Sequence, residues 1–220
     1  MTHSHGAAPT TELPDAGTPS WRLLATLGGS GALAGLLLVL AWQWTTPSIT
    51  AHRAQVEQAA VAEVLKVPAR MDTLYVVDGK LTRTPVGDPA KLERLVEGFD
   101  AQGKRSGVAG RAGEPGFADV VSVMIGFDPA DGSLLGMKIL GQKETPGLGD
   151  KIEKDSAFVG QFTGAKAPLT GVKARSGDNK SQVATITGAT ISSRTVIRII
   201  NNAVARWQPM LAAYDREAKP

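Results

Sequence analysis

The chain has 220 residues, 42% of them hydrophobic, which is enough for one domain with its own core. Its 24 lysines and arginines against 21 aspartates and glutamates leave a net charge of +3, too small an excess to predict nucleic-acid binding. The absence of cysteine excludes disulfides, thiolate catalysis and cysteine-ligated metal sites. No histidine follows His52, so the globular part has neither histidine acid–base chemistry nor a His-rich metal site. We therefore predict no metal site.

The N-terminal region predicts a tail followed by a membrane anchor. Residues 1–20 are rich in Pro, Thr, Gly and Ala, a composition typical of a disordered tail. Residues 23–44 carry no charge, and at a rise of about 1.5 Å per residue such a helix can cross a hydrocarbon core of roughly 30 Å. We predict one transmembrane helix over residues 21–45. A buried soluble helix and a cleaved signal peptide are the weaker alternatives, because the run is long and no small-x-small cleavage site follows it.

The residues that flank the predicted transmembrane helix are typical of a membrane interface, but they do not fix the orientation of the helix in the membrane. Trp21, Trp42 and Trp44 flank the apolar run as aromatic residues do at membrane–water interfaces. Arg22 stands on one side of the apolar run and Arg53, Lys66 and Arg70 on the other, so the count of basic residues is a weak signal that leans slightly against an exported C-terminal domain.

The remainder of the chain predicts an α+β domain with an antiparallel sheet packed by helices. Residues 48–67 form an amphipathic pattern whose apolar positions are Val56, Ala60, Val64 and Val67. Strands are predicted at 74–77, 120–127, 134–140, 169–175 and 182–186, with a turn at Asp78-Gly79 and a hairpin joining the second and third. Residues 90–99 fit a helix or a strand, and residues 100–116 are Gly-rich and polar. From Ser192 the apolar residues recur at helical spacing until Pro209, which ends or kinks the helix.

The stretch ATITGATISSRT, residues 184–195, places several hydroxyl side chains where a strand turns into a helix. Thr190 stands at the junction. Helix N-termini present unpaired N–H groups and a partial positive charge, both of which favour phosphate, and Arg194 and Arg198 are close enough in sequence to add charge. Gly188 and Ala189 lack bulk, so a ligand can approach the backbone. The alternative is a plain Thr/Ser helix cap on a tight turn.

A second stretch, KETPGLGDKIE at residues 143–153, predicts a loop of defined shape. Pro146 fixes one backbone dihedral, whereas Gly147 and Gly149 allow unusual ones. Leu148 stands exposed between the two glycines. Such a loop can lay its backbone and a leucine against a flat ring, although an ordinary Pro-Gly turn also fits the pattern.

Taken in order after a single anchor helix, ETPGLG and TGATISS resemble the FMN-binding domain of the G subunit of the Rnf complex. The C subunit of the sodium-pumping NADH:quinone oxidoreductase is the next most similar. The resemblance covers residues 21–207 and is most specific over residues 117–200. It divides the chain into a tail (1–20), a transmembrane helix (21–45), a membrane-proximal helix with strands (46–97), an FMN-binding domain (98–208) and a C-terminal tail (209–220).

The resemblance implies a covalently bound FMN that relays electrons, with no independent catalysis by this chain. The flavin phosphate would be esterified to Thr190, preceded by Thr187, Gly188 and Ala189. The loop Glu144, Thr145, Pro146, Gly147, Leu148 and Gly149 would line the isoalloxazine ring. It also implies a flavin transferase for maturation, other membrane subunits as partners, and electron transfer between ferredoxin and NAD that drives ion transport. The chain would be a single-pass protein of the bacterial inner membrane with its C-terminal domain in the periplasm.

Two positions depart from the family pattern. Ala184 stands where an aspartate is usual, three residues before Thr187, and Gln142-Lys143 stand where histidine is common. Three alternatives therefore stay open: a component of the quinone-reducing complex, a flavoprotein donor to another periplasmic system, and a non-redox membrane-anchored assembly module.

Overall fold

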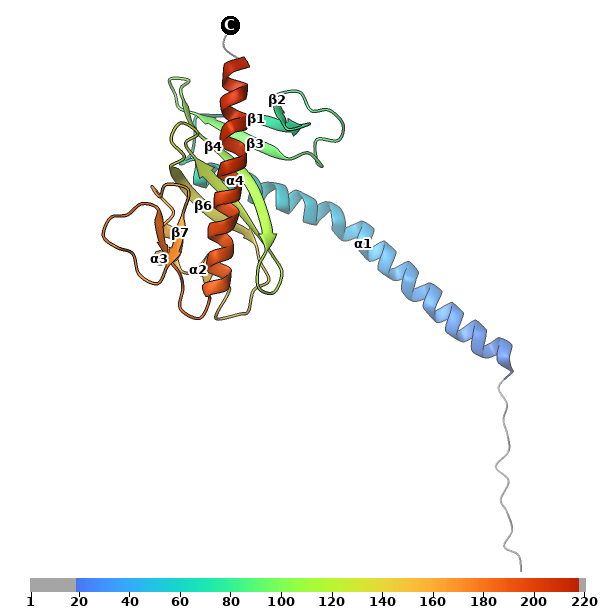
Figure 1. Cartoon of the computed structure of the whole chain (residues 1–220). Helices are drawn as coiled ribbons and strands as arrows, with labels where there is room; N and C mark the ends of the chain where they lie inside the picture. The colour runs from blue at the N-terminus through green and yellow to red at the C-terminus, as the bar shows by residue number, and fades with distance from the viewer. Residues whose placement is uncertain (1–18, 218–220) are drawn as a thin grey trace, which may run out of the picture. The chain divides into compact units, whose positions relative to one another are not determined.

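The computed structural model of the chain describes residues 19–217 (Figure 1). It divides into two compact units that meet between His52 and Arg53, inside the first helix. The predicted tail over residues 1–20 lies almost wholly outside the described residues.

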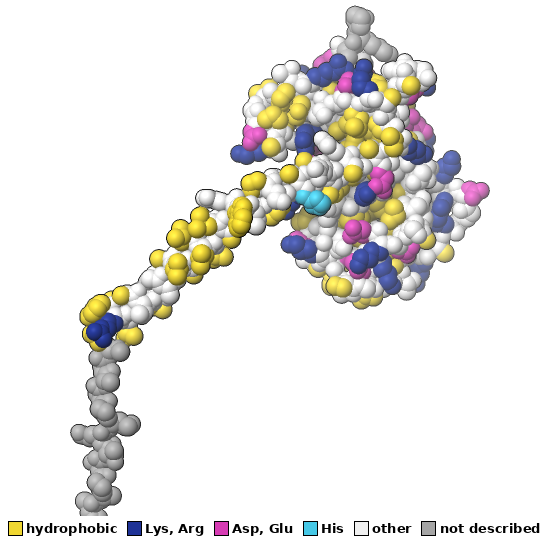
Figure 2. All heavy atoms as spheres, turned by 180° about the vertical axis from the view of Figure 1, so that it is seen from behind, with side chains coloured by type: hydrophobic (Ala, Val, Ile, Leu, Met, Phe, Trp, Pro, Cys, Tyr) yellow, Lys and Arg dark blue, Asp and Glu magenta, His cyan; other side chains and the backbone are white. Residues whose placement is uncertain are grey.

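The first unit is the apolar part of helix α1 (Ser20–Val64). By length and composition α1 can cross a membrane, and Figure 2 shows hydrophobic side chains along it. The helix continues through Pro47, which lacks an N–H donor. The hydroxyls of Thr46 and Thr50 donate to carbonyls one turn earlier, those of Trp42 and Thr46. Both are local side-chain hydrogen bonds within the helix, with one hydroxyl on each side of the proline.

The second unit is built on one six-stranded antiparallel sheet with the order β2-β1-β3-β4-β5-β6 (Figure 1). Its strands are β1 (Arg70–Val77), β2 (Lys80–Thr82), β3 (Arg94–Phe99), β4 (Arg105–Pro115), β5 (Val120–Phe127) and β6 (Leu134–Gly141). The predicted hairpin of residues 120–127 and 134–140 is confirmed as β5 and β6. So is the Asp78-Gly79 turn, whose two residues have positive φ values of 49° and 77°, as a tight hairpin requires.

Strand β4 lies within the segment that the sequence marks only as Gly-rich and polar. Glycine is depleted in strands, so the pattern hides the strand. The structure explains the glycines by close packing: a Cβ at Gly110 would stand 2.6 Å from both Leu95 Cδ2 and Trp207 Cη2. Residues 94–99 prove to be a strand rather than a helix. Because β3 spans Arg94–Phe99, the sheet continues across the domain boundary that we predict between residues 97 and 98.

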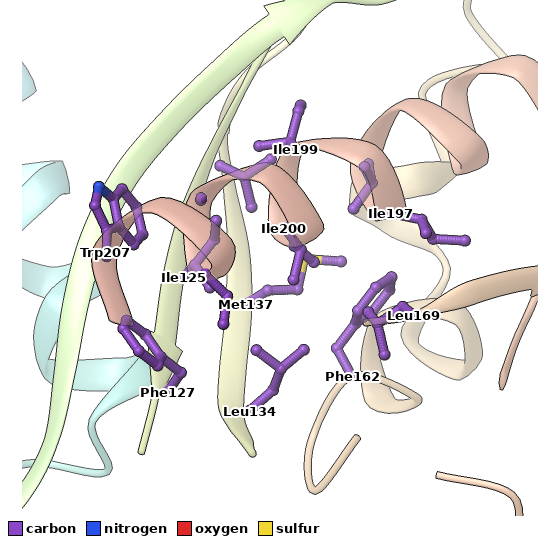
Figure 3. Close-up of a cluster of buried hydrophobic side chains, with 14 of the residues drawn as sticks. Ile125, Phe127, Leu134, Met137, Phe162, Leu169, Ile197, Ile199, Ile200 and Trp207 are labelled. Atoms are coloured by element: carbon purple, nitrogen blue, oxygen red, sulfur yellow. The ribbon is translucent and has the colours of Figure 1, made fainter. Parts of the chain in front are cut away.

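Helix α4 (Thr190–Glu217) covers one face of the sheet (Figure 1). Its apolar stripe meets the alternate residues of β5 that point to that face, including Ile125 and Phe127, as Figure 3 shows. The helix does not end at Pro209; it continues to Glu217, with Leu211 fully buried. It also begins at Thr190, two residues before the predicted start at Ser192.

The opposite face of the sheet is covered by the last turns of α1, which belong to the second unit. Ala60, Val61 and Val64 are buried there against Ala109 and Met124. The expectation for Val67 is wrong: it lies beyond the helix at a φ of 56° and is exposed. Glu57 adds ion pairs to Arg94 and Arg111 of the sheet, at 3.0 and 2.5 Å. Membrane-proximal helix and sheet thus form one body.

The segment between β6 and α4 holds two short helices, α2 (Lys151–Lys154) and α3 (Ser156–Gly160), and two short strands, β7 (Thr170–Val172) and β8 (Gln182–Ala184). The last two match the strands predicted at 169–175 and 182–186, but they pair in parallel. This segment leads the chain from one edge of the sheet back to the start of α4.

Trp207 is the side chain on which the core should depend most. It is fully buried, stacks on Phe127 with ring centroids 6.1 Å apart, and donates its Nε1–H to Glu93 at 2.8 Å. We expect Trp207→Ala to lower the free energy of unfolding of the second unit by about 3–5 kcal/mol, because it leaves a large cavity. Denaturant titration of the full chain in detergent, followed by circular dichroism, measures this. Trp44→Ala, an exposed position outside the core, is the matched control and should leave the midpoint unchanged; equal midpoints for both variants would contradict the assignment.

Candidate functional site

Three segments that are far apart in the sequence meet beside the start of α4. They are the turn at residues 116–119 between β4 and β5, the loop at residues 142–150 after β6, and the turn at residues 186–189. Together they enclose a pocket of about 400 Å³. Its lining residues are Phe117, Glu144, Thr145, Leu148, Gly149, Gly188, Ala189, Thr190, Ile191 and Ser192. Both sequence motifs therefore contribute to one site, although about forty residues separate them.

The turn before α4 is held by one buried serine. Ala189 N–H donates to the Ile186 carbonyl at 3.0 Å, and Gly188 takes a φ of 84°, which favours glycine. The Ser193 Oγ accepts from the Ile186 N–H at 3.1 Å and donates to the Ala189 carbonyl at 2.9 Å. Ser193 thus fixes the turn from inside the helix, and it does not act as a helix cap.

No hydroxyl caps this helix. The Ala189 carbonyl accepts the first helical hydrogen bond, from Ser193 N–H at 2.9 Å, so the cap position holds an alanine with no side-chain acceptor. Within the part of the chain that the structure describes, the N–H groups of Thr190, Ile191 and Ser192 have no protein acceptor. The plain Thr/Ser cap is therefore wrong. What the fold leaves at this point is an open helix N-terminus that can bind an anion.

The loop at residues 144–149 packs directly against that turn. Gly147 has a φ of 76°, and the Thr145 carbonyl accepts from the N–H groups of Leu148 and Asp150, which closes the loop on itself. Leu148 is half-exposed, with its Cδ2 3.4 Å from where a Cβ of Gly188 would stand. The expected exposed leucine is therefore present. Of the predicted site residues, Thr187, Pro146 and Gly147 do not line the pocket, whereas the other seven do.

Glu144 is the central polar residue of the site. Its side chain is buried, with 4% of the residue exposed. One carboxylate oxygen accepts from the N–H groups of Phe117 and Ala118 at 2.9 and 3.1 Å, and the other accepts from the Ser192 hydroxyl at 2.5 Å. Burial opposes ionisation, but these hydrogen bonds together outweigh it and hold the pKa of the Glu144 carboxyl below its ordinary value.

The arginines near the start of α4 do not line the pocket, so they do not add positive charge to its wall as expected. Neither Arg194 nor Arg198 lines it. The Arg198 side chain instead donates to Glu114 at 2.6 Å and to the Pro115 carbonyl at 2.9 Å. Lys143 pairs with Asp119 at 3.1 Å and is exposed. Glu144 is therefore the charged residue of the pocket wall, and the positive potential there comes from the helix N-terminus.

The two positions that depart from the family pattern have structural partners. Gln142 accepts from the Glu144 N–H at 2.7 Å and donates to Glu153 at 3.1 Å, so it supports the loop from outside the pocket. The backbone of Ala184 is held at both ends by the side chain of Gln161, through hydrogen bonds of 2.7 and 3.2 Å.

Three lining residues, Phe117, Ile191 and Ser192, were not among the predicted site residues. Phe117 is an exposed aromatic residue beside a glycine, but nothing in the sequence links it to motifs so far away. A larger groove of about 780 Å³ lies along the membrane-proximal helix and the outer face of the sheet, and none of the motif residues lines it.

Comparison with known proteins agrees with this geometry. Residues 116–205 match the FMN-binding domain family. The G subunit of the Na⁺-translocating ferredoxin:NAD⁺ oxidoreductase complex of Acetobacterium woodii is 30% identical over 197 residues, which cover 86% of this chain and 93% of that protein. The G subunit of the ion-translocating oxidoreductase complex of Pseudomonas aeruginosa is 30% identical, with coverage of 82% and 85%.

Two crystal structures share the fold. NqrC of Shewanella oneidensis superposes with a TM-score of 0.60 at 18% identity, covering 74% of this chain and 99% of that one. The C subunit of the Na⁺-translocating NADH-quinone reductase of Parabacteroides distasonis gives 0.51 at 21% identity, covering 66% and 78%. At these identities the likeness concerns the fold alone. The identity, coverage and shared FMN-binding domain show that the chain belongs to the Rnf family of G subunits of ion-translocating oxidoreductase complexes.

Proposed function

We propose that this chain is the electron-transfer G subunit of an Rnf-type ion-translocating oxidoreductase and carries FMN bound covalently through a phosphoester to Thr190. The observation that carries the proposal is the start of α4. Thr190 is the first residue of the helix and lines the pocket, and the helix N-terminus there has open N–H donors and no side-chain cap.

The residues of the pocket fit a flavin phosphate. Three N–H groups at a helix N-terminus stabilise a negative charge through hydrogen bonds and through the helix dipole. The pocket wall adds no lysine or arginine, so a phosphate has little else to retain it. A covalent link supplies that retention, which gives a physical reason for a hydroxyl at this position.

The attachment reaction requires only the Thr190 hydroxyl from this chain. Its Oγ loses a proton and forms a bond to phosphorus, while the bond from phosphorus to the leaving group of an activated flavin donor breaks. Catalysis of that exchange is assigned to a separate flavin transferase, because the one carboxylate of the pocket wall, Glu144, is already engaged by three hydrogen-bond donors.

The apolar residues around the pocket suit the ring system. Phe117, Leu148 and Ile191 are large, exposed side chains that line the same pocket. Exposed apolar side chains of this kind indicate a bound group or a partner surface. When bound, FMN supplies the redox chemistry. The chain holds and orients it and sets the electrostatic environment, with Glu144 fixing the loop that would lie along the ring.

The membrane complex completes the proposal. The relatives named for Na⁺-translocating and proton-translocating ferredoxin:NAD⁺ oxidoreductase complexes suggest that electrons pass between ferredoxin and NAD through partner subunits and drive Na⁺ or H⁺ transport. Helix α1 would anchor the chain in the inner membrane, with the FMN-binding domain in the periplasm. The likeness to NqrC is one of fold, so the quinone-reducing complex is the weaker assignment.

The covalent link is tested by Thr190→Ala. We expect the wild-type chain, co-expressed with a flavin transferase, to give a flavin-fluorescent band on a denaturing gel and an intact mass increased by the flavin. Thr190→Ala should abolish both signals because the acceptor oxygen is gone. Thr187→Ala, which removes an exposed hydroxyl outside the pocket lining, is the matched control and should keep at least part of the fluorescence.

A dark wild-type band with an unshifted mass would contradict the proposal and favour the non-redox assembly module. Fluorescence that persists in Thr190→Ala and disappears in Thr187→Ala would show that the flavin is linked to Thr187 instead.

The membrane topology has its own test. A reporter that is active only in the periplasm, fused after Pro220, should be active, because flavin attachment after export requires the domain on that side. Activity of a cytoplasmic reporter at the same position would reverse the topology. The same fusions to a chain with charged residues introduced into residues 33–40 show whether export depends on the apolar helix.

A further inference from the structure

The hydrogen bonds of Glu144 connect the loop after β6 to the β4–β5 turn and to the start of α4. Glu144 belongs to that loop, accepts from the backbone of Phe117 and Ala118 in the turn, and accepts from Ser192 in the first turn of the helix. The Ser192 contact therefore ties the loop to the helix, and the backbone contacts tie it to the turn beside the Lys143–Asp119 ion pair.

Two glycines leave space for the Glu144 side chain. A Cβ at Gly149 would stand 2.7 Å from the Glu144 Cβ and 3.1 Å from the Ser192 Oγ. A Cβ at Gly116 would likewise collide with the Glu144 carboxylate. Real Cβ atoms do not tolerate such approaches, so both glycines make room for this one side chain.

The carboxylate is stabilised without a cation. Its donors are two backbone N–H groups and one hydroxyl, all neutral. The neighbouring Lys143 pairs with Asp119, and Lys154 with Asp150 at 2.7 Å. The pocket wall therefore retains an uncompensated negative charge in a buried position, where charges act more strongly than in water.

We infer that Glu144 is a positioning residue with two separable effects: its hydrogen bonds lock the loop after β6 to the β4–β5 turn and to the start of α4, and its negative charge lowers the reduction potential of the flavin bound there. The first effect is a property of the chain alone, whereas the second rests on the proposed function. The physical reason for the second is that reduction adds negative charge to the flavin, and a fixed anion nearby disfavours that addition.

Two substitutions separate the effects. Glu144→Gln keeps the shape of the side chain and the oxygen that accepts from the Phe117 and Ala118 N–H groups, and its amide can donate to the Ser192 oxygen. This variant therefore loses the charge and keeps the hydrogen bonds. Ser192→Ala keeps the charge, still stabilised by two N–H donors, but releases the loop from α4. Asp119→Asn is the control for removing a charge from an exposed carboxylate on the adjacent turn.

The effect of the Glu144 hydrogen bonds on the loop is measured by hydrogen–deuterium exchange. The sample is the full chain in detergent, prepared without flavin transferase. We expect Ser192→Ala to speed the exchange of amides in residues 144–149 by about tenfold, as loss of one buried hydrogen bond would do, and Glu144→Gln to change it less than about threefold. Unchanged exchange in Ser192→Ala would show that the hydrogen bond from Ser192 to Glu144 does not hold the loop to α4.

The charge effect is measured on the flavin-loaded chain by spectroelectrochemical titration. The midpoint potential should become more positive in Glu144→Gln and should stay at the wild-type value in Asp119→Asn. An unchanged potential in Glu144→Gln, or equal shifts in Glu144→Gln and Asp119→Asn, would overturn the charge effect.

The two inferences fail in different ways. If the wild-type chain never acquires flavin, the proposed function fails, but the exchange measurement still decides whether Glu144 locks the pocket. If flavin is attached normally and only the potential of Glu144→Gln is unchanged, the proposed function stands and the electrostatic role of Glu144 is wrong.

Discussion

The packing of α4 on the sheet is the interaction on which the rest of this domain depends. One apolar stripe buries Val196, Ile200, Val204 and Trp207 against the sheet and so forms one side of the main core. The same packing fixes where the first residue of the helix lies. Beyond Pro209 the helix is held further by Arg105, which pairs with Asp215 of α4 and with buried Glu97 of β3. A helix anchored over its length presents its N-terminus at a defined place, which a loop by itself would not do.

The site is assembled at the end of that helix from segments with little structure of their own. Each contains glycines that allow tight turns or close approach, and each depends on its neighbours for shape. The buried carboxylate of Glu144 joins the loop after β6 to the β4–β5 turn and to the helix through neutral donors, which leaves the open helix N-terminus as the positive feature of the pocket. This division of roles suits a protein whose chemistry belongs to a bound cofactor.

Sequence patterns predicted the regular elements where the periodicity was strong. The β5–β6 hairpin and the Asp78-Gly79 turn were recoverable because alternation and turn residues are local signals. Strand β4 was not, because its glycines are placed for packing against Leu95 and Trp207, which lie elsewhere in the chain. The end of α4 was misplaced for a similar reason: burial of Leu211 and the ion pair of Asp215 keep the helix intact past a proline.

By itself the sequence determined the apolar helix, the α+β class, the absence of cysteine chemistry, and the two motifs that resemble an FMN-binding domain. The tertiary structure decided what each residue of those motifs does. It made Ala189 the cap residue of α4 without a side-chain acceptor, turned Ser193 inward to hold the turn, directed Ser192 to Glu144, and engaged Arg198 with Glu114. These roles depend on hydrogen bonds between residues from four to eighty-four positions apart, and a linear pattern carries no information about which distant donor meets which acceptor.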